Sequence, residues 1–187
     1  MSVIVGIDEV GRGSWAGPLV AGAVILNTPV TGLKDSKKLT KIQRKKLAII
    51  INSKALAVGL GWVSHDQVDK LGLTSAVTLA MRLAIQQIEI AYDEIIVDGN
   101  FNFLSLTPNS RSVINGDALI PSISAASIVA KVARDEFMSQ IALKYPNYGF
   151  ETHVGYGTAR HLAAIRKYGV CSIHRLSYNP IKQALSP

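Results

Sequence analysis

The sequence predicts one α/β domain in which a mixed β-sheet is flanked by helices. The chain has 187 residues, of which 48% are hydrophobic, so one folded domain with a full core is possible. Patterns typical of strands and of helices are interleaved along it. In three places an apolar, strand-like run ends in acidic residues close to glycine or alanine.

The first predicted strand is the β-branched run 3–5, which leads into segment 6–13, GIDEVGRG. Two adjacent carboxylates, Asp8 and Glu9, end the apolar run, and a Gly-Arg-Gly turn follows. Charge and bare backbone are therefore expected at a sheet edge, where open α/β sheets bind ligands. Residues 18–26 predict a second strand that returns along the first.

The next segments predict a strand between helices. Thr40 follows a polar, basic loop and is a suitable N-cap for a helix over 41–53. Weak alternation of apolar residues predicts a third strand over 55–63. A short helix over 65–71 and a longer one over 74–91 are predicted to follow.

The second half of the chain repeats the opening pattern. Residues 94–99 form an apolar run that ends in an acid and a glycine, and residues 112–117 give a third case. Pro121 begins a long predicted helix that reaches about Tyr145.

The last part of the chain looks partly irregular. Residues 146–157 are rich in glycine, tyrosine and histidine, and a helix over 158–168 and a polar tail are predicted after them. No repeat, low-complexity segment or linker divides the chain, so we predict a single domain over residues 1–187.

Charge and cysteine content narrow the class of protein. The chain has 20 Lys and Arg against 13 Asp and Glu, a formal net charge of +7, which favours nucleic acid as a partner ahead of a membrane. The single cysteine, Cys171, excludes an internal disulfide and suits a reducing compartment. Because the first apolar run breaks at Asp8 and no run is long enough to cross a bilayer, we expect a cytoplasmic protein without a signal peptide.

Four carboxylates at three predicted strand ends are candidate metal ligands: Asp8, Glu9, Asp98 and Asp117. Mg²⁺ and Mn²⁺ prefer oxygen ligands, and clustered acids repel one another unless a cation joins them. Each acid alone is more simply a cap or turn residue, but the repeated pattern favours a metal site. Neighbours on a regular strand point to opposite faces, so Glu9 can join Asp8 only if it lies beyond the last regular pair.

Residues 11–16 also fit a loose dinucleotide-binding fingerprint, with Asp35 about 20 residues further on. That fingerprint must begin a helix, whereas Gly17-Pro18 and a β-branched run follow here, and the preceding acids would repel pyrophosphate. We favour glycines that expose backbone groups to a close ligand, with Arg12 either binding phosphate or solvated.

Basic and polar residues supply candidates for phosphate contacts. Ser124, Ser127, Lys131 and Arg134 recur at spacings of three and four on the long predicted helix, which makes one polar stripe. Such a stripe suits a phosphate backbone, although an ordinary solvated face explains it equally well. Lys37 could also meet phosphate, or could simply be solvated.

The segment 153–158, HVGYGT, places Tyr156 between two glycines. Such a ring can stack on a sugar or a base, and the alternative is a core aromatic beside a turn. His153, His161 and His174 could move protons, but lone histidines are more often structural, so we assign them no function.

Taken together, the motifs resemble those of bacterial ribonuclease HII, the type 2 ribonuclease H family. The resemblance extends from Gly6 to about Pro180, and the chain departs from the family pattern at Ser14-Trp15 and at Asn115. The matching strings, in order, are GIDEVGRG with AGP, DSKKL, VDG, GDA, SAASIVAKVARD, HVGYGT and HR.

The resemblance implies a ribonuclease H-like mixed sheet with flanking helices and a small helical C-terminal part, about 146–187, that contacts substrate. It implies that the four carboxylates bind two Mn²⁺ or Mg²⁺ ions. It also implies that Gly11, Arg12 and Gly13 recognise the ribose 2′-OH, and that Tyr156 stacks on the sugar at the RNA–DNA junction.

The implied activity is metal-dependent cleavage of the RNA strand of RNA–DNA hybrids and of single ribonucleotides in duplex DNA. Cleavage on the 5′ side of the ribonucleotide would leave a 3′-hydroxyl and a 5′-phosphate and would support removal of ribonucleotides from DNA. We expect a monomer that binds these duplexes and no membrane, with Lys37, Lys131 and Arg134 near phosphates. A non-catalytic hybrid-binding module is the main alternative, but it has no use for four acids.

Overall fold

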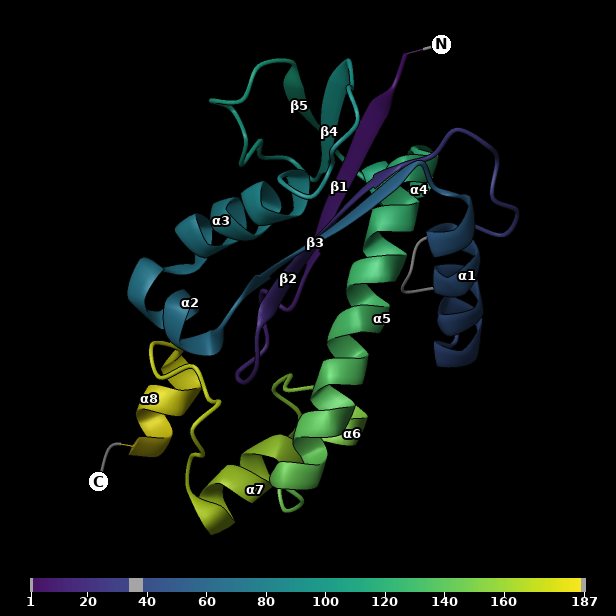
Figure 1. Cartoon of the computed structure of the whole chain (residues 1–187). Helices are drawn as coiled ribbons and strands as arrows, with labels where there is room; N and C mark the ends of the chain where they lie inside the picture. Colours follow the sequence, from purple (N-terminus) through teal and green to yellow (C-terminus); the bar gives the residue numbers. More distant parts are fainter. Residues whose placement is uncertain (1, 34–38, 186–187) are drawn as a thin grey trace.

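A five-stranded mixed sheet lies at the centre of the residues that the computed structural model describes, 2–33 and 39–185 (Figure 1). The strand order is β3-β2-β1-β4-β5. The strands are β1 (Ile4–Val10), β2 (Leu19–Ile25), β3 (Ala57–Val63), β4 (Glu94–Asp98) and β5 (Ser110–Val113). The predicted mixed sheet is confirmed.

Three parallel strands end at one edge of this sheet. β1 pairs antiparallel with β2 but parallel with β4, and β4 pairs parallel with β5. Asp8 and Glu9 of β1 therefore lie at the same edge as Asp98 of β4, and β5 leads toward Asp117. The last aligned pair of β1 and β4 directly precedes Asp8 and Asp98, which makes these two carboxylates neighbours.

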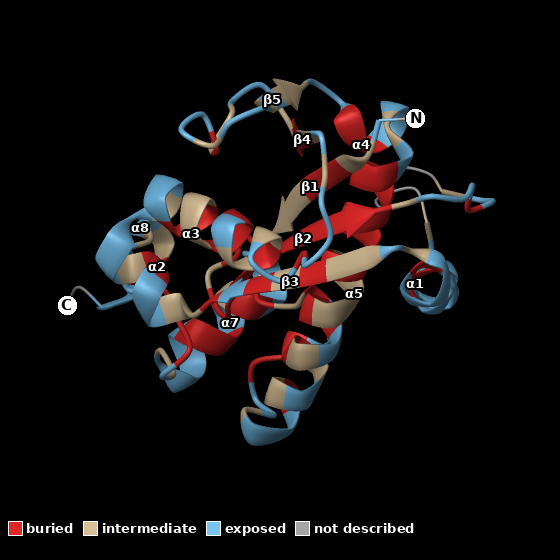
Figure 2. Cartoon of the chain, turned by 45° about the horizontal axis from the view of Figure 1, so that its top comes forward, coloured by how far each residue is buried: buried red, intermediate tan, exposed pale blue. Residues whose placement is uncertain are grey.

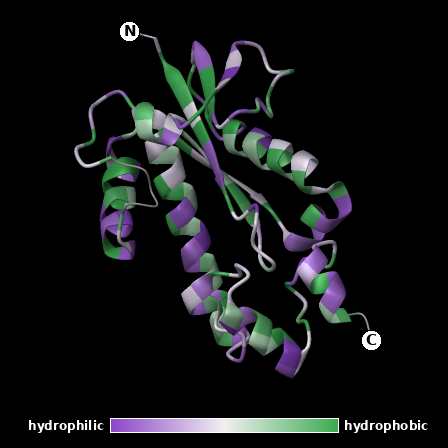
Figure 3. Cartoon of the chain, turned by 180° about the vertical axis from the view of Figure 1, so that it is seen from behind, coloured by the Kyte–Doolittle hydropathy of each residue, from purple (hydrophilic) through white to green (hydrophobic). Residues whose placement is uncertain are grey.

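Helices cover both faces of the sheet (Figure 1). On one face α5 (Pro121–Lys144) crosses β1 and β2, and α1 (Lys41–Lys54) packs beside it. On the other face α3 (Leu73–Ile85) packs on β1, β2 and β3, and α2 (His65–Leu71) precedes it. Figure 3 shows hydrophilic and hydrophobic residues alternating along α1, as expected for a helix that packs on one side only.

Short helices follow α5 and return the chain to its beginning. They are α6 (Phe150–His153), α7 (Ala159–Tyr168) and α8 (Asn179–Leu185), while α4 (Gly116–Leu119) precedes α5. The Gly17 N–H donates to the Ile173 carbonyl at 2.9 Å, and the Arg175 N–H donates to the Trp15 carbonyl at 2.8 Å. The C-terminal segment is thereby bonded to the turn that follows β1.

Glycines in the sheet allow α5 to lie directly on β1 and β2. A Cβ added at Gly22 would come within 2.5 Å of the Ala126 carbonyl oxygen, and one at Gly6 would meet the backbone of Ile123. The N-terminal half of α5 is consequently buried on all sides, over residues 122–130 (Figure 2). This close contact brings Ser127 to the end of β1.

Several element boundaries differ from the sequence prediction. β1 continues through both carboxylates to Val10 because β2 pairs with it throughout. α3 ends at Ile85 rather than near residue 91, because the Gln87 side chain bonds both backbone groups of Leu60, at 3.2 and 2.7 Å. α4, α6 and α8 were not predicted; they are only four, four and seven residues long, and tertiary contacts support them.

The structure also excludes the dinucleotide-binding alternative. Residues after Gly17 form β2 rather than a helix, so the glycines of segment 11–16 do not present a helix N-terminus. Asp35 lies outside the described residues. Among residues 2–33 and 39–185, none of the helices combines the length and the hydropathy of a membrane-spanning segment.

Candidate functional site

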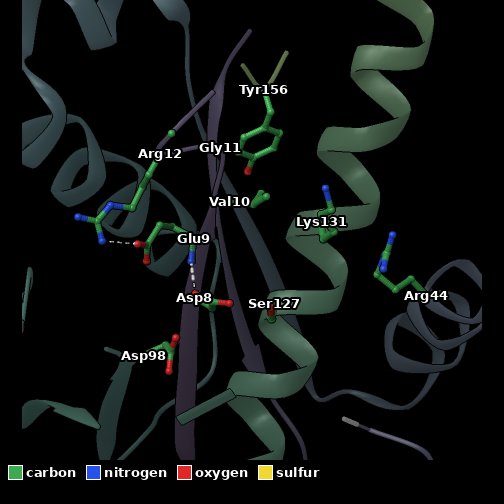
Figure 4. A pocket seen from close by; sticks show the side chains of 11 residues that line it. Asp8, Glu9, Val10, Gly11, Arg12, Arg44, Asp98, Ser127, Lys131 and Tyr156 are labelled. Atoms are coloured by element: carbon green, nitrogen blue, oxygen red, sulfur yellow. Dashed lines mark hydrogen bonds and ion pairs between the residues drawn. The ribbon is translucent and has the colours of Figure 1, made fainter. Parts of the chain in front are cut away.

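A cavity of about 370 Å³ opens where β1 and β4 end, between the Gly-Arg-Gly turn and α5 (Figure 4). It gathers residues that lie far apart in the sequence. Its lining consists of Asp8, Glu9, Val10, Gly11, Arg12, Gly13, Arg44, Asp98, Ser127, Lys131 and Tyr156. Most of the site residues predicted from the sequence therefore share one cavity.

Asp8 lies between β4 and α5 on the acidic side of this cavity (Figure 4). Its Oδ1 accepts a hydrogen bond from the Glu9 N–H at 2.7 Å, and Ser127 of α5 bonds to its carboxylate. Burial, followed by the charges of Glu9 and Asp98, raises the pKa of Asp8 from 3.8 to about 8. In the metal-free protein this carboxyl group is mostly protonated at neutral pH.

Glu9 occupies the next position of β1, opposite Ala21 in a regular antiparallel pair. The condition that Glu9 lie beyond the last regular pair is therefore not met on the β2 side, but it is met on the β4 side, where pairing ends at Ile7. Glu9 shares the cavity with Asp8, because β4 stops pairing with β1 at Ile7 and leaves that edge of β1 open. Glu9 Oε1 accepts from Arg12 Nη1 at 3.0 Å; burial raises the pKa of Glu9, and Arg12 partly offsets the rise.

The two remaining acids contact each other. The Asp117 N–H, at the start of α4, donates to Asp98 Oδ1 at 3.2 Å. Asp117 is buried and does not line the cavity. Asn115 makes the preceding turn with a left-handed backbone (φ 55°), a conformation that asparagine tolerates better than most residues.

The four carboxylates, Asp8, Glu9, Asp98 and Asp117, have the donor atoms and the negative charge that a divalent cation requires. Within the described ranges, no three His, Cys, Asp or Glu side chains stand in a ready-made coordination geometry. The four carboxylates nevertheless offer only oxygen donors, which Mg²⁺ and Mn²⁺ prefer. The raised pKa values of Asp8 and Glu9 show that burial and mutual repulsion disfavour their charged forms, and a bound cation would relieve both effects.

Arg134 was predicted to contact phosphate, but in the structure it is buried beneath the turn that follows β1. Its side chain is 0% exposed and donates to the Pro18 carbonyl at 2.8 Å, the Val154 carbonyl at 2.9 Å and Ser14 Oγ at 2.7 Å. The prediction fails because the turn after β1 covers the middle of α5, where Arg134 lies. Burial lowers the pKa of Arg134 to about 10, so it remains a cation at neutral pH. Arg134 supports the turn from inside the protein.

Arg175 supports the same turn, a role that the sequence motifs did not predict. It is also 0% exposed, and it donates to the Gly17 carbonyl at 2.9 and 3.1 Å and to the Arg12 carbonyl at 3.1 Å. The carbonyl groups of the turn are thus bonded to buried guanidinium groups. Ser14, one of the departures from the family pattern, adds a hydrogen bond from its Oγ to the Gly11 carbonyl at 2.9 Å.

The polar stripe predicted on α5 is only partly open to the cavity. Ser127 and Lys131 line it, and Lys131 Nζ pairs with Asp135 Oδ1 at 2.8 Å. Ser124 is 3% exposed and does not line the cavity, because the helix packs on the sheet at that level. Lys37 lies outside the described residues.

Tyr156 and Arg44 also line the cavity, and they come from distant parts of the chain. Tyr156 follows α6, and its ring faces the cavity with Lys131 Nζ 5.7 Å from the ring centroid (Figure 4). Arg44 reaches the cavity from α1 and was not singled out from the sequence. The signal was present, since Thr40 predicted where α1 begins and Arg44 lies one turn later in a basic run.

Comparisons of the sequence give one family, and comparisons with solved structures give one fold. A family model described as Ribonuclease HII matches residues 5–181. A protein of Polaromonas sp. named Ribonuclease HII is 45% identical over 185 residues, which are 98% of this chain and 92% of that protein. The crystal structure of ribonuclease H2 from Pyrococcus horikoshii matches with a TM-score of 0.82 and 26% identity, over 97% of this chain and 96% of that one. The structure of a ribonuclease HIII (Bst-RNase HIII) in complex with Mn²⁺ has the same fold, with a TM-score of 0.75 and 20% identity, over 98% of this chain and 69% of that one.

Proposed function

Because the chain belongs to the ribonuclease HII family and is a ribonuclease H, we propose that it cuts the RNA strand of RNA–DNA hybrids and single ribonucleotides within duplex DNA. Cleavage falls on the 5′ side of the ribonucleotide and leaves a 3′-hydroxyl and a 5′-phosphate. The observation that carries this proposal is the meeting of Asp8, Glu9 and Asp98 in one cavity that also contains Arg12 and Lys131. Acids for a metal and cations for a phosphate backbone thus lie side by side.

The metal would be held by Asp8, Glu9, Asp98 and Asp117. Asp117 lies next to this group, because its backbone N–H donates to Asp98 Oδ1. When bound, two Mg²⁺ or Mn²⁺ ions supply an activated water and stabilise the leaving 3′ oxygen. The carboxylates must lose their protons to bind metal, so binding strengthens as pH rises through the pKa of Asp8. The Mn²⁺ complex of the structurally similar ribonuclease HIII supports this proposal.

The turn at residues 11–13 is proposed to recognise the ribonucleotide. Gly11 has φ 92°, and a Cβ there would meet Arg134 Nε at 2.5 Å, so this position requires glycine. A Cβ at Gly13 would meet nothing within 4 Å, which leaves that backbone open to a close ligand. Only the 2′-OH separates RNA from DNA at a single nucleotide, and a turn of small residues can approach it. Tyr156 would stack on the sugar at the RNA–DNA junction.

One experiment tests the proposed activity. A duplex with a single ribonucleotide and a long RNA–DNA hybrid are each incubated with Mg²⁺, Mn²⁺ or EDTA and resolved on a denaturing gel. We expect cleavage with a divalent ion and none with EDTA, and an all-DNA duplex should stay intact. A 2′,3′-cyclic phosphate product would contradict the mechanism, and binding without cleavage would favour the non-catalytic alternative. We expect the monomer to be the active form.

Lys131 and Arg44 are predicted to contact phosphates. Lys131→Ala and Arg44→Ala should each weaken binding of an RNA–DNA hybrid and reduce the slope of log K against log [salt] by about 1, because one counterion fewer is released. Fluorescence anisotropy between low and moderate salt measures the slope. Lys70→Ala is the matched control, since Lys70 is exposed on α2 and pairs with Asp66. A slope unchanged in both cavity variants would remove these residues from the binding surface.

A further inference from the structure

Three histidines form a buried cluster beneath the segment that carries Tyr156. His153, His161 and His174 are 7%, 0% and 1% exposed. The rings of His153 and His161 stack with centroids 4.5 Å apart, and those of His161 and His174 are 5.2 Å apart. None of the three lines the cavity, so they act through the residues that they hold.

The partners of two rings determine which nitrogen carries each proton. His161 Nδ1 lies 3.0 Å from the Tyr156 carbonyl oxygen, which can only accept, so Nδ1 is protonated and Nε2 of the neutral ring is bare. His161 Nε2 lies 3.0 Å from His174 Nε2, so His174 must donate there. His174 Nδ1 is then bare, and it accepts the Cys171 N–H at 2.8 Å, with Cys171 Sγ at 3.2 Å. The Cys171 carbonyl, 3.1 Å from the same nitrogen, accepts the His174 backbone N–H at 3.0 Å instead.

These hydrogen bonds all run in one direction. The Cys171 N–H donates to His174, His174 donates to His161, and His161 donates to the Tyr156 carbonyl. This arrangement requires neutral rings, because an extra proton would place two donors against each other. Burial is the main cause that lowers the pKa of both histidines, for His161 to about 4, so both are neutral at physiological pH.

His153 holds the other side of the same segment. Its Nε2 lies 2.7 Å from the Tyr148 carbonyl and therefore donates, while its Nδ1 accepts the Gly155 N–H at 3.3 Å. The His153 carbonyl accepts the Tyr156 N–H at 2.9 Å. The backbone of Tyr156 is thus fixed at its N–H through His153 and at its C=O through His161.

The segment needs such support because it contains unfavourable backbone. Val154 has φ 45°, in the left-handed region that β-branched residues rarely adopt, and Gly155 has φ 86°. Other bonds also hold the segment, since Arg134 donates to the Val154 carbonyl at 2.9 Å and the Trp15 N–H donates to the Gly155 carbonyl at 2.8 Å. The histidine bonds act at Tyr156 and its neighbours, and without them we expect the Tyr156 ring to leave its place in the cavity.

We propose that His161, with His174 behind it, is a positioning residue that fixes the Tyr156 ring in the cavity for substrate. The proposal rests on the proposed function, since it gives Tyr156 a role on the sugar of the ribonucleotide. His161 itself touches no substrate. Its effect on cleavage passes through one carbonyl bond.

Two substitutions separate this role from simple packing. His161→Asn keeps an N–H donor close to the position of Nδ1, whereas His161→Leu fills a similar volume without a donor. On a single-ribonucleotide duplex we expect His161→Leu to lower kcat/KM by about 10- to 100-fold, the loss that a misplacement of about 1 Å can cause. His161→Asn should recover most of it. Arg166→Leu is the control, because Arg166 is exposed on α7, the same helix as His161.

A double-mutant cycle gives the decisive readout. In a Tyr156→Ala background, His161→Leu should lower kcat/KM by less than about twofold further, because residues that act as one unit are not additive. Losses that multiply, or a His161→Asn variant as impaired as His161→Leu, would overturn the proposal. Wild-type protein that cuts neither substrate would instead refute the proposed function.

A measurement on the unaltered protein keeps the proposal testable if His161→Leu does not fold. Nitrogen-15 NMR of histidine-labelled protein distinguishes protonated from bare ring nitrogens. We expect the proton on Nδ1 of His161 and on Nε2 of His174. The opposite tautomer of His161 would leave the Tyr156 carbonyl with the Thr158 N–H as its donor and no bond from the ring, and would overturn the proposal.

Discussion

Asp8→Asn is expected to lower cleavage of both substrates by at least about 100-fold. Changes to residues that merely support a metal ligand typically cost 10- to 100-fold, and Asp8 is placed to be a ligand itself. Hybrid binding without metal should stay within about threefold of wild type, because the cations of the cavity are unaltered. Initial rates on the gel assay and anisotropy titrations in EDTA measure the two quantities.

Asp66→Asn is the control for this substitution. Asp66 is an exposed carboxylate of α2 outside the cavity, so its loss should leave cleavage unchanged. Retention of Mg²⁺-dependent cleavage at near wild-type rate in Asp8→Asn would show that the metal does not depend on Asp8. A parallel loss of binding would show that the substitution damaged the fold.

The same substitution should stabilise the metal-free protein. The folded-state pKa of Asp8, about 8, lies above its unfolded value, so between about pH 4 and 8 the folded state retains a proton that the unfolded state has lost. The free energy of unfolding of wild type therefore falls as pH rises through this window. Asp8→Asn removes that contribution and should raise the melting temperature at pH 7 by a few degrees, about 2–4 °C per kcal/mol. Thermal melts in EDTA at pH 5, 6, 7 and 8 give the comparison, and equal pH slopes in both proteins would contradict it.

Tyr156→Ala is expected to lower cleavage at a single ribonucleotide by about 10- to 100-fold, and cleavage of a long hybrid by a much smaller factor. Stacking on an aromatic ring contributes about 1–3 kcal/mol, and a lone ribonucleotide offers only one RNA–DNA junction on which to use it. In a long hybrid, neighbouring ribonucleotides provide further contacts. The ratio of kcat/KM on the two substrates is the quantity to measure.

Tyr156→Phe is the matched variant, because it keeps the ring and removes only the hydroxyl. It should retain the wild-type ratio if stacking is the contribution. Equal losses on both substrates in Tyr156→Ala would remove the junction role, and equal losses in Tyr156→Phe and Tyr156→Ala would assign the effect to the hydroxyl instead.

Local patterns predicted much of this architecture. Thr40 with Gln43 forms the capping box expected at the start of α1, and Pro121 is at the first position of α5. The strands β1, β2 and β4 contain short apolar runs that are buried in the structure. The apolar residues of these runs were therefore enough to predict where the strands lie. The grouping of Asp8, Glu9 and Asp98 was predicted from a repeated pattern, an apolar strand that ends in an acid close to glycine or alanine.

Other features could not be predicted because they depend on long-range contacts. Helical spacing correctly placed Arg134 on the same stripe as Lys131, but spacing does not show that the turn after β1 covers the end of that stripe. Arg175 lies 163 positions from the Arg12 carbonyl that it holds, and no local pattern reveals such a bond. The histidine cluster likewise forms only when three separate segments meet.

The bond between Arg175 and the turn after β1 has a consequence for biosynthesis. On the ribosome the first strands emerge long before Arg175 does, so a nascent chain can build much of its sheet while the turn at residues 11–13 still lacks its internal support. The proposed cutting activity should therefore arise only after Arg175 has been translated and has reached this turn.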